Sequence, residues 1–419
     1  MRNRLKALIA GGIAAAILLA AQIVPARITV DSGIALNQMA RTGKLAGAVR
    51  LLESQYRFDT PAGLRALHDF SLVVLRQGLS DPDPFERCYA ATALASYGDW
   101  SGREIIGQAL DSPNLFIQKA AVEGLAQAEN SDALGILERF YRLSGPVSQT
   151  IALQALAEVK APAVMPILVS AAKDPNSSGT FWAVNGLGRM GDRAALPYLQ
   201  GLLTKSIDPM VRTEAAHSMI LLGDRSLYTT DALEEGLGSS DSEIAAEAAL
   251  ALGDAHDPAT VEVLEATVSS DRAAEQLRMA AAVALTHYGS RQGMPLLVAA
   301  LNDHKRRATY LPGMLDHLDF VVGRPLILRA ISSSEQQLRL TAYEMIGRSG
   351  GEADIAVLSE ALAHTQEPID QAQIAWSLGR IGRPEAIPVL LEVLQNPSSE
   401  VRYTAAEALA RIADKQAHN

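Results

Sequence analysis

Five side chains between residues 303 and 329 are suited to binding an anion. They are Lys305, Arg306, Arg307, Tyr310 and His317. An arginine guanidinium can donate two parallel hydrogen bonds to a carboxylate or a phosphate. The stretch has five basic and three acidic residues, a net charge of +2, in a chain whose net charge is −10. We predict a hinge or recognition patch for a carboxylate- or phosphate-bearing partner; the alternative is a stretch repacked around an irregular helix.

The common catalytic motifs are either absent from the sequence or misplaced in it, so they indicate no active site. Neither Gly-x-x-x-x-Gly-Lys nor His-Glu-x-x-His occurs, and the one Gly-x-Ser-x-Gly match, residues 347–351, falls where a helix should end, not on a strand-to-helix turn. Four histidines, His217, His256, His287 and His317, lie in successive units of a repeat, but at unmatched positions. We therefore predict no catalytic residue, no metal ligand and no cofactor.

The composition is that of a helical globular protein. Hydrophobic residues make up 48% of the chain and aromatic residues only 5%, which favours helices over sheets. Cys88 is the single cysteine, so an internal disulfide and a cysteine-based zinc cluster are excluded, and we expect its side chain to be buried. The net charge of −10 argues against nucleic acid as the main partner.

A repeat of about 31 residues must position these side chains. One apolar residue, here called the marker, recurs every 30 to 33 residues, with Asp316 replacing it once: Leu94, Leu125, Leu156, Leu187, Met219, Leu252, Leu285, Ile346, Leu378 and Leu409. An alanine usually precedes the marker by four residues and a small residue precedes it by one. These positions share one helix face, so each unit offers a flat stripe on which another helix can pack closely.

Glycines and Asx-Pro pairs indicate where the helices end and begin. Glycines four residues after the marker favour a left-handed helix end: Gly98, Gly191, Gly223, Gly289, Gly350 and Gly382. Asx-Pro pairs favour helix starts between units: Asp81-Pro82, Asp174-Pro175, Asp208-Pro209 and Asn396-Pro397. Each unit is therefore predicted to contain two helices. The eighth unit departs from the pattern, with Pro312, Leu315 and Phe320 at the diagnostic positions around Asp316.

The sequences VRYTAAEAL at residues 401–409 and IAWSLGRIGRPEAIP at residues 374–388 show the repeat most fully. They resemble the HEAT-repeat family, in the short variant named after the HEAT-like repeats of phycobilisome lyases. The resemblance covers residues 68–419. It implies an all-α, right-handed solenoid of about eleven two-helix repeats, preceded by an N-terminal apolar helix. With packed helices about 8–10 Å apart, we expect a superhelix roughly 100 Å long with one concave face.

The resemblance also implies a structural ladder of arginines. In this family an arginine near the start of the first helix pairs with an acid in a neighbouring turn. That position is held here by Arg87, Arg212, Arg278, Arg339 and Arg402. Exposed pairs of this kind contribute about 0–1 kcal/mol each, so we expect them to set the register between units.

Enzymes built from similar repeats lack support in the residues. Deoxyhypusine hydroxylases hold iron through paired His-Glu dipeptides, and this sequence contains no His-Glu dipeptide. HEAT-like DNA glycosylases use a basic concave surface, which the acidic charge opposes, and phycobilin lyases share only the repeat. We therefore predict a non-enzymatic scaffold that binds another protein through its concave face. The alternative is a lyase-type or other enzyme, or a ligand-binding protein, that uses the same groove.

Residues 1–26 are a separate segment. Three basic residues precede an uncharged run at residues 7–24, which as a helix would span roughly 27 Å. We predict a signal-anchor in the inner membrane of a bacterium, with the repeats facing the periplasm; the alternative is cleavage near Ala26 and a released protein. Residues 27–67 are expected to form a juxtamembrane helical segment or cap.

The last unit is expected to lack its second helix. Only seven residues follow Ile412, too few for another helix to cover the stripe of Ala405, Ala408 and Leu409. We predict weak self-association through this uncovered apolar side.

Overall fold

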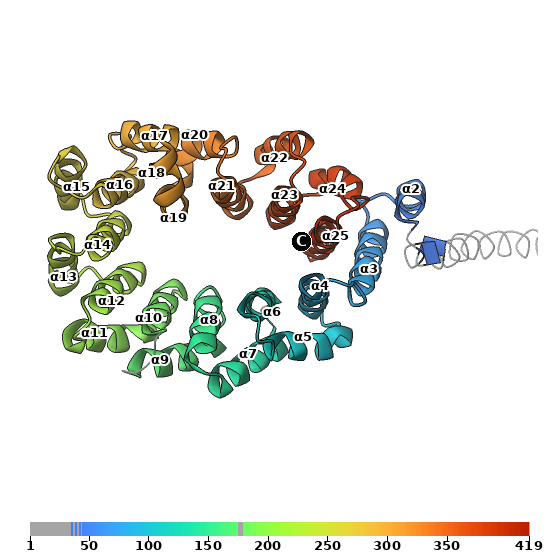
Figure 1. The fold of residues 1–419 in the computed structure, drawn as a ribbon, viewed down its shortest axis with the longest axis horizontal. Helices are drawn as coiled ribbons and strands as arrows, with labels where there is room; N and C mark the ends of the chain where they lie inside the picture. Colours follow the sequence, from blue (N-terminus) through green and yellow to red (C-terminus); the bar gives the residue numbers. More distant parts are fainter. Residues whose placement is uncertain are drawn as a thin grey trace, which may run out of the picture.

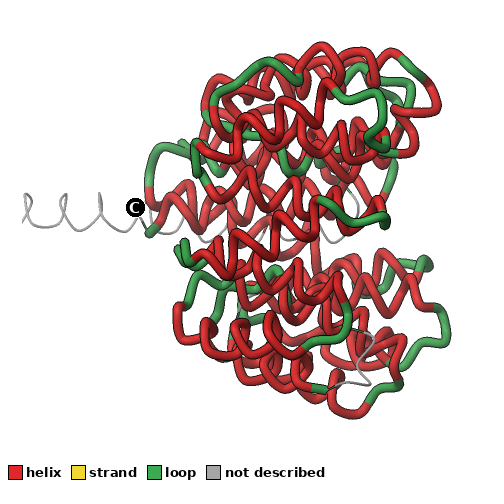
Figure 2. Tube along the Cα trace, turned by 90° about the vertical axis from the view of Figure 1, so that its left-hand side faces the viewer, coloured by secondary structure: helices red, strands yellow, loops and turns green. Residues whose placement is uncertain are grey.

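The structure, a computed structural model, describes residues 35–36, 38–39, 42, 44–128, 130–174 and 179–418. Throughout these ranges the secondary structure is helical, and no strand occurs. Two layers of helices follow one another around a ring (Figure 1). Seen from the side, the described trace is almost entirely helix joined by short loops (Figure 2).

The inner layer holds the first helix of each unit. These helices are α4 (Pro84–Ser96), α6 (Leu115–Ala128), α8 (Pro146–Leu156), α10 (Thr180–Arg189), α12 (Pro209–Leu221), α14 (Ser242–Ala255), α16 (Glu275–Ala284), α19 (Leu311–Leu315), α21 (Gln336–Ser349), α23 (Pro368–Ile381) and α25 (Ser399–Ala417). A 3-10 turn, η4 (Leu285–Tyr288), continues α16.

The outer layer holds the second helices. These are α5 (Arg103–Leu110), α7 (Ser131–Leu143), α9 (Met165–Lys173), α11 (Leu196–Lys205), α13 (Leu227–Leu237), α15 (Ala259–Ser269), α17 (Met294–Asn302), α20 (Phe320–Ala330), α22 (Glu352–His364) and α24 (Ile387–Val393). Two further helices, α2 (Leu45–Gln55) and α3 (Pro61–Gly78), precede the first unit. The predicted all-α solenoid of two-helix repeats is confirmed.

Of the three Asx-Pro pairs that are fully described, one coincides with a helix start and two lie two residues too early; α25 begins at Ser399 rather than Pro397. The Asp208 carboxylate accepts a hydrogen bond from the amide of Met210, so α12 begins at the expected Asx-Pro pair. The helix α4 begins two residues later than expected, because Asp83 caps it by accepting from the amide of Phe85. A proline stands at the first turn of both helices, where its missing N–H costs no hydrogen bond.

Helix ends follow the glycine signals at five of six positions. The glycines with positive φ, between 71° and 81°, are Gly98, Gly191, Gly223, Gly289 and Gly382. Gly350 was expected among them, but its φ is −77°, so the backbone after α21 leaves the helix in an extended conformation instead.

The small residue before each marker allows neighbouring inner helices to approach closely. A Cβ atom on Gly188 would lie 2.5 Å from Ser218 Oγ, and one on Gly379 would lie 2.7 Å from the Cα atom of Ala408. Ser218 and Ala408 directly precede the markers of the following units. The flat stripe predicted from the sequence is therefore the surface on which the next unit packs.

The eighth unit is irregular, as the sequence indicates. Two short helices, α18 (His304–Thr309) and α19, stand where other units have one inner helix. Pro312 lies at the start of α19. Proline has no N–H to continue the hydrogen bonds of a preceding helix, so Pro312 disfavours one uninterrupted helix through α18 and α19.

The two ends of the repeat array meet. The helix α25 packs along α3 and also contacts α4, which closes the ring (Figure 1). The Tyr403 hydroxyl donates to Asp81 at 3.0 Å, and the Tyr89 hydroxyl donates to Glu407. The sequence predicts a superhelix but not its closure: small rotations between neighbouring units accumulate until the last unit reaches the first.

Ring closure also covers the end of the array. Ala405, Ala408, Leu409 and Ile412 on α25 are all buried. The helix α3 supplies the cover that we expected to be missing. The apolar surface from which we predicted self-association is therefore occupied within the same chain.

The N-terminal predictions fall largely outside this description. The proposed signal-anchor, residues 1–26, is not among the described residues, and the boundary expected between residues 67 and 68 falls inside α3. Of the helices that are described, none combines the length and the apolar character needed to cross a membrane. We accordingly withdraw the predicted single-pass, periplasm-facing localisation.

Candidate functional site

Five titratable side chains meet at one place on the inner layer. Glu214 and His217 lie on α12, Glu247 and Asp254 lie on α14, and His287 lies on η4. Spacings of three residues on α12 and seven on α14 put each pair on one face of its helix. We call these five residues the inner-face cluster.

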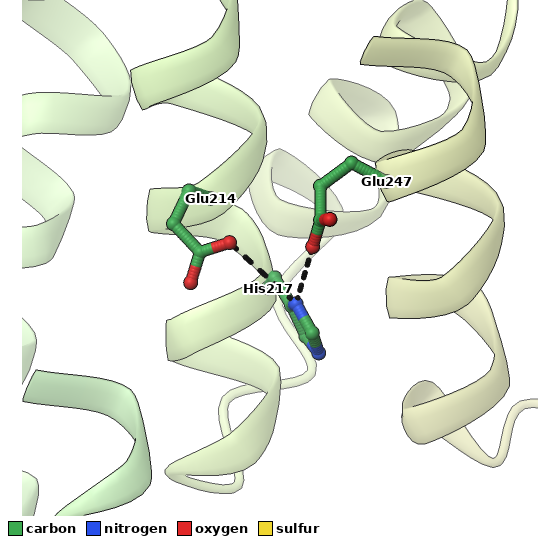
Figure 3. A group of neighbouring side chains, drawn as sticks. All are labelled: Glu214, His217 and Glu247. Atoms are coloured by element: carbon green, nitrogen blue, oxygen red, sulfur yellow. Dashed lines mark hydrogen bonds and ion pairs between the residues drawn. The ribbon is translucent and has the colours of Figure 1, made fainter. Parts of the chain in front are cut away.

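Two glutamates approach one imidazole in the inner-face cluster. His217 Nδ1 lies 3.0 Å from Glu247 Oε1 and 3.8 Å from Glu214 Oε2 (Figure 3). The side chains of Glu214 and His217 are 0% and 5% exposed, whereas that of Glu247 is 18% exposed. One nitrogen or oxygen atom from each of the three residues lies within 4.8 Å of the other two. Glu247 is thus the member of this trio that solvent reaches most easily.

Asp254 bridges two imidazoles. Its Oδ2 atom lies 2.8 Å from His217 Nε2, and its Oδ1 atom lies 3.1 Å from His287 Nδ1. His287 Nε2 in turn lies 2.7 Å from the backbone oxygen of His317, in the turn after α19. A continuous chain of polar contacts therefore runs from α12 to the irregular eighth unit.

One oxygen of Glu214 is left without a partner. Oε1 accepts a hydrogen bond from Asn185 Nδ2 at 3.0 Å, and Ser218 Oγ lies 3.3 Å from it. Oε2 is buried and has no hydrogen-bond partner among the described residues. Buried carboxylate oxygens are nearly always satisfied in native proteins, so this atom needs an explanation.

Burial and neighbouring charges act against each other on the pKa values of the cluster. Burial works to lower the pKa of His217, but the nearby carboxylates of Asp254, Glu214 and Glu247 outweigh it and hold that pKa well above its ordinary value. Burial works to raise the pKa of Asp254, yet its bonds to His217 and His287 hold it far below the usual range. Burial raises the pKa of Glu214. At neutral pH a protonated His217 therefore faces an ionised Asp254.

A pocket of about 170 Å³ adjoins the inner-face cluster. Its lining includes Asp254 and His287 from the cluster, and Asp316, His317 and Leu318 from the eighth unit. Burial lowers the pKa of His317, which favours the neutral imidazole at this wall of the pocket. The irregular unit therefore contributes to the surroundings of the cluster.

The described residues of the predicted anion-binding patch differ in what they contact. The Arg306 guanidinium pairs with Glu275 on α16, and Lys305 is exposed. Tyr310 packs partly buried against the apolar core. Arg307 lies within α18, but its side chain is outside the described part of the chain. Among the members of the predicted patch whose side chains are described, His317 lines the pocket beside the cluster.

The predicted arginine ladder binds backbone oxygens. Each arginine donates to a carbonyl at or just after the end of the preceding outer helix, or of α3 in the first unit: Arg87 to Asp81, Arg212 to Ser206, Arg278 to Val268, Arg339 to Ser333 and Arg402 to Asn396. Arg339 also pairs with Asp370 of the next unit, 2.5 Å away. The guanidinium groups thus cap helix ends whose carbonyls lack helical partners.

The sequence carries a signal for the inner-face cluster that we did not use. We compared only the histidines with one another, and they share no repeat position. Glu214 and Glu247 both stand five residues before the markers of their units, Met219 and Leu252, and no other unit has an acid at that position. Two adjacent units that depart from the pattern in the same way indicate a shared site.

Comparisons with known proteins identify the repeat. A family profile described as HEAT repeats matches residues 72–150, 144–220, 230–310 and 363–418. A curated relative, deoxyhypusine hydroxylase-B of Oryza sativa subsp. japonica, is 25% identical over 291 residues, which cover 67% of this chain and 82% of the relative.

Two solved structures of similar build were also found. The complex of CpcE and CpcF of phycocyanin lyase from Nostoc has a TM-score of 0.37 and 19% identity, over 55% of this chain and 92% of that one. Human deoxyhypusine hydroxylase in complex with glycerol has a TM-score of 0.31 and 17% identity, over 77% of this chain and 96% of that one.

The curated relative contradicts one prediction. We expected a non-enzymatic scaffold, because the sequence lacks the common catalytic motifs. The relative that aligns with two thirds of this chain is a hydroxylase, an enzyme. The prediction of a non-enzymatic scaffold is therefore corrected, because the relative that was found is an enzyme.

Proposed function

The chain belongs to the HEAT-repeat family, and from that premise we propose that it is an enzyme whose active site is the inner-face cluster and the adjoining pocket. The observation that carries this proposal is the convergence of Glu214, His217, Glu247, Asp254 and His287 from three consecutive units. Groups of carboxylates and imidazoles that meet beside a pocket are typical of catalytic sites.

The chemistry of these groups suits proton transfer. Asp254 holds the rings of His217 and His287 in fixed orientations, as a carboxylate does for a catalytic imidazole. Asp254, His287 and His317 line the pocket and are available to a ligand there. In this proposal they orient the substrate and exchange protons with it. The HEAT-repeat build supports a protein as partner or substrate.

The iron of the hydroxylase relatives does not fit this chain. The resemblance implied iron ligands in paired His-Glu dipeptides, and none occurs in the sequence. Glu214 and His217 are three residues apart on α12, and Glu247 comes from another unit. We therefore route no step through that iron centre, and we do not transfer the relative's substrate to this chain.

The proposal is tested by comparing cells that lack the chain with cells that carry variants of it. Untargeted mass spectrometry of metabolites and proteins should reveal a mass change that depends on the wild-type chain. Asp254→Asn should reduce the amount of that product about 100-fold, in line with the loss of a group that transfers protons. Glu123→Gln is the matched control, because Glu123 lies on the inner helix α6, away from the cluster.

Two results would refute the enzyme proposal. One is a product profile that is the same with and without the chain. The other is full activity of a folded Asp254→Asn protein, which would place catalysis elsewhere. Circular dichroism spectra of both variants verify that they are folded.

A further inference from the structure

We propose that Glu214, His217 and Glu247 bind a divalent transition-metal ion. The proposal goes beyond the enzyme proposal, because a bound ion is measurable without any substrate. Figure 3 shows the three side chains turned toward one another from α12 and α14.

The three ligand atoms are close enough to share an ion. One atom from each residue lies within 4.8 Å of the other two. Ligand atoms bound to one zinc ion at about 2.0–2.2 Å lie within roughly 4.4 Å of each other. Small side-chain rotations therefore bring all three atoms into bonding distance.

The unpartnered oxygen of Glu214 is independent evidence for a ligand. Oε2 is buried and has no hydrogen-bond partner within the described ranges. It lies 3.8 Å from His217 Nδ1, so it is the Glu214 oxygen that faces His217. The other oxygen of the same carboxylate is held by Asn185. A missing ion is one of the recognised reasons for such an orphaned group. An ion among the three residues would give Oε2 its partner.

Asp254 and His287 surround His217 in the way that neighbouring residues orient a metal-binding histidine. A metal-binding histidine typically donates its second ring N–H to a carboxylate, which fixes the ring orientation. A bound ion would replace the proton on His217 Nδ1, which faces the two glutamates, and Nε2 would keep its proton 2.8 Å from Asp254. Asp254 is in turn held by His287.

The donor set selects the class of ion. An imidazole nitrogen with carboxylate oxygens suits Zn²⁺, Mn²⁺ or Fe²⁺, whereas Ca²⁺ and Mg²⁺ favour oxygen ligands alone. Three protein ligands leave a coordination position for water or substrate, as in catalytic zinc sites. Glu247, the most exposed of the three, stands at the accessible side.

The test is metal binding by the purified full-length chain after treatment with a chelator. Calorimetry with Zn²⁺ and Mn²⁺, and the visible absorption spectrum with Co²⁺, measure affinity and ligand type. We expect one ion per chain, and an affinity at least 100-fold lower in Glu214→Gln and in His217→Asn. Asp254→Asn should weaken binding by about 10–100-fold, as changes behind a ligand do.

Two controls separate this site from non-specific binding. His256→Asn removes an exposed histidine two residues from Asp254, and Glu123→Gln removes a partly exposed glutamate of another inner helix. Both should bind the ion as the wild type does. Because Glu214 is buried, Glu247→Gln is a second ligand variant with less risk to folding, and it too should bind at least tenfold more weakly.

Absence of binding by the folded wild type, or equal affinity in wild type and all three ligand variants, would overturn the metal site. Loss of ion binding without loss of product would separate the two proposals: the site would bind a metal, and the enzyme proposal would fail for this cluster.

Discussion

At the scale of single residues, a change at Asp254 affects both histidines of the inner-face cluster and the adjoining pocket. It is the carboxylate shared by His217 and His287, and it also lines the pocket beside them. Its side chain is 24% exposed, so the network is neither sealed from solvent nor fully screened by it. Removing its charge affects two imidazoles at once.

We predict that Asp254→Asn lowers the free energy of unfolding by about 1–3 kcal/mol at pH 7, because the buried His217 and the mostly buried His287 lose a charged acceptor. The pKa of Asp254 is lowered in the folded chain. Its contribution is therefore present above the unfolded value near 3.8 and disappears as the pH falls through the folded value.

Urea denaturation at pH 7 and pH 3 measures this difference. The gap between wild type and Asp254→Asn should shrink at the lower pH. Asp271→Asn, at an exposed turn before α16, should change little at either pH. A gap that widens toward pH 3 would contradict the role given to the Asp254 charge.

At the scale of helices, small residues set the spacing between neighbouring units. Glycines that follow the marker lie against the small residue that precedes the next marker, as Gly379 does against Ala408. A side chain at such a position has no space unless the helices separate. The alanine-rich stripe is therefore a requirement of close helix packing as well as of helix propensity.

We predict that Gly379→Ala destabilises the chain by about 1–3 kcal/mol, since overpacking forces the backbone to shift. The added Cβ would lie 2.7 Å from Ala408 Cα. Gly107→Ala is the matched control, because Gly107 is also within a helix but has no atom within 4 Å of the added Cβ. It should stabilise the chain by about 0.5–1 kcal/mol. Thermal and urea unfolding distinguish the two signs, and equal effects would contradict the packing argument.

At the scale of the whole molecule, contacts between α25 and the helices α3 and α4 convert a linear array into a ring. We call these contacts the seam. Glu407 on α25 is 7% exposed, accepts from Tyr89 on α4 and pairs with Arg411 at 2.6 Å. In an open array each unit contacts only its neighbours in the sequence. The seam adds contacts between residues more than 300 positions apart.

We predict that Glu407→Gln lowers the free energy of unfolding by about 1–3 kcal/mol, because Arg411 loses its charged partner in a mostly buried site. Amide hydrogen exchange should rise first in α3 and α25 and remain unchanged in α14. Glu392→Gln, on the exposed side of α24, should leave exchange at the seam as it is. If amide hydrogen exchange became faster by the same factor in all helices of the ring, the contacts of the seam would not open separately from the rest of the structure.

The seam also predicts a dependence on pH. Burial, with the charges of Glu400, Asp81 and Asp83, raises the pKa of Glu86 to about 7, although Arg402 opposes the shift. A raised carboxyl pKa penalises the folded state as the pH rises from about 4.5 to 7.

Glu86→Gln should therefore stabilise the chain by roughly 1 kcal/mol at pH 8, a value reduced for partial solvent screening. It should have little effect at pH 4. Glu262→Gln, exposed on α15, serves as the control. Urea unfolding at both pH values checks this, and a larger effect at pH 4 than at pH 8 would refute it.

The amino-acid sequence by itself determines the repeat. Marker residues, small residues and helix-end glycines act between neighbours in the sequence or between adjacent units, so the two-helix unit and the break at Pro312 follow from local pattern. The same pattern misplaces three details: α4 begins at Pro84 rather than Pro82, α25 begins at Ser399 rather than Pro397, and Gly350 is not left-handed. At α4 the Asp83 carboxylate accepts the capping hydrogen bond, which moves the helix start by two residues.

Only the tertiary structure decides closure of the ring and the make-up of the inner-face cluster. Closure depends on small rotations summed over all units, and no single repeat encodes that sum. The cluster joins Glu214 and Glu247, which share one repeat position, with His287, which stands at another position in a third unit. Spacing within one helix reveals which residues share a face, but the distance between facing side chains depends on how adjacent helices pack. That packing brings together at one site acids and histidines that no common sequence motif links.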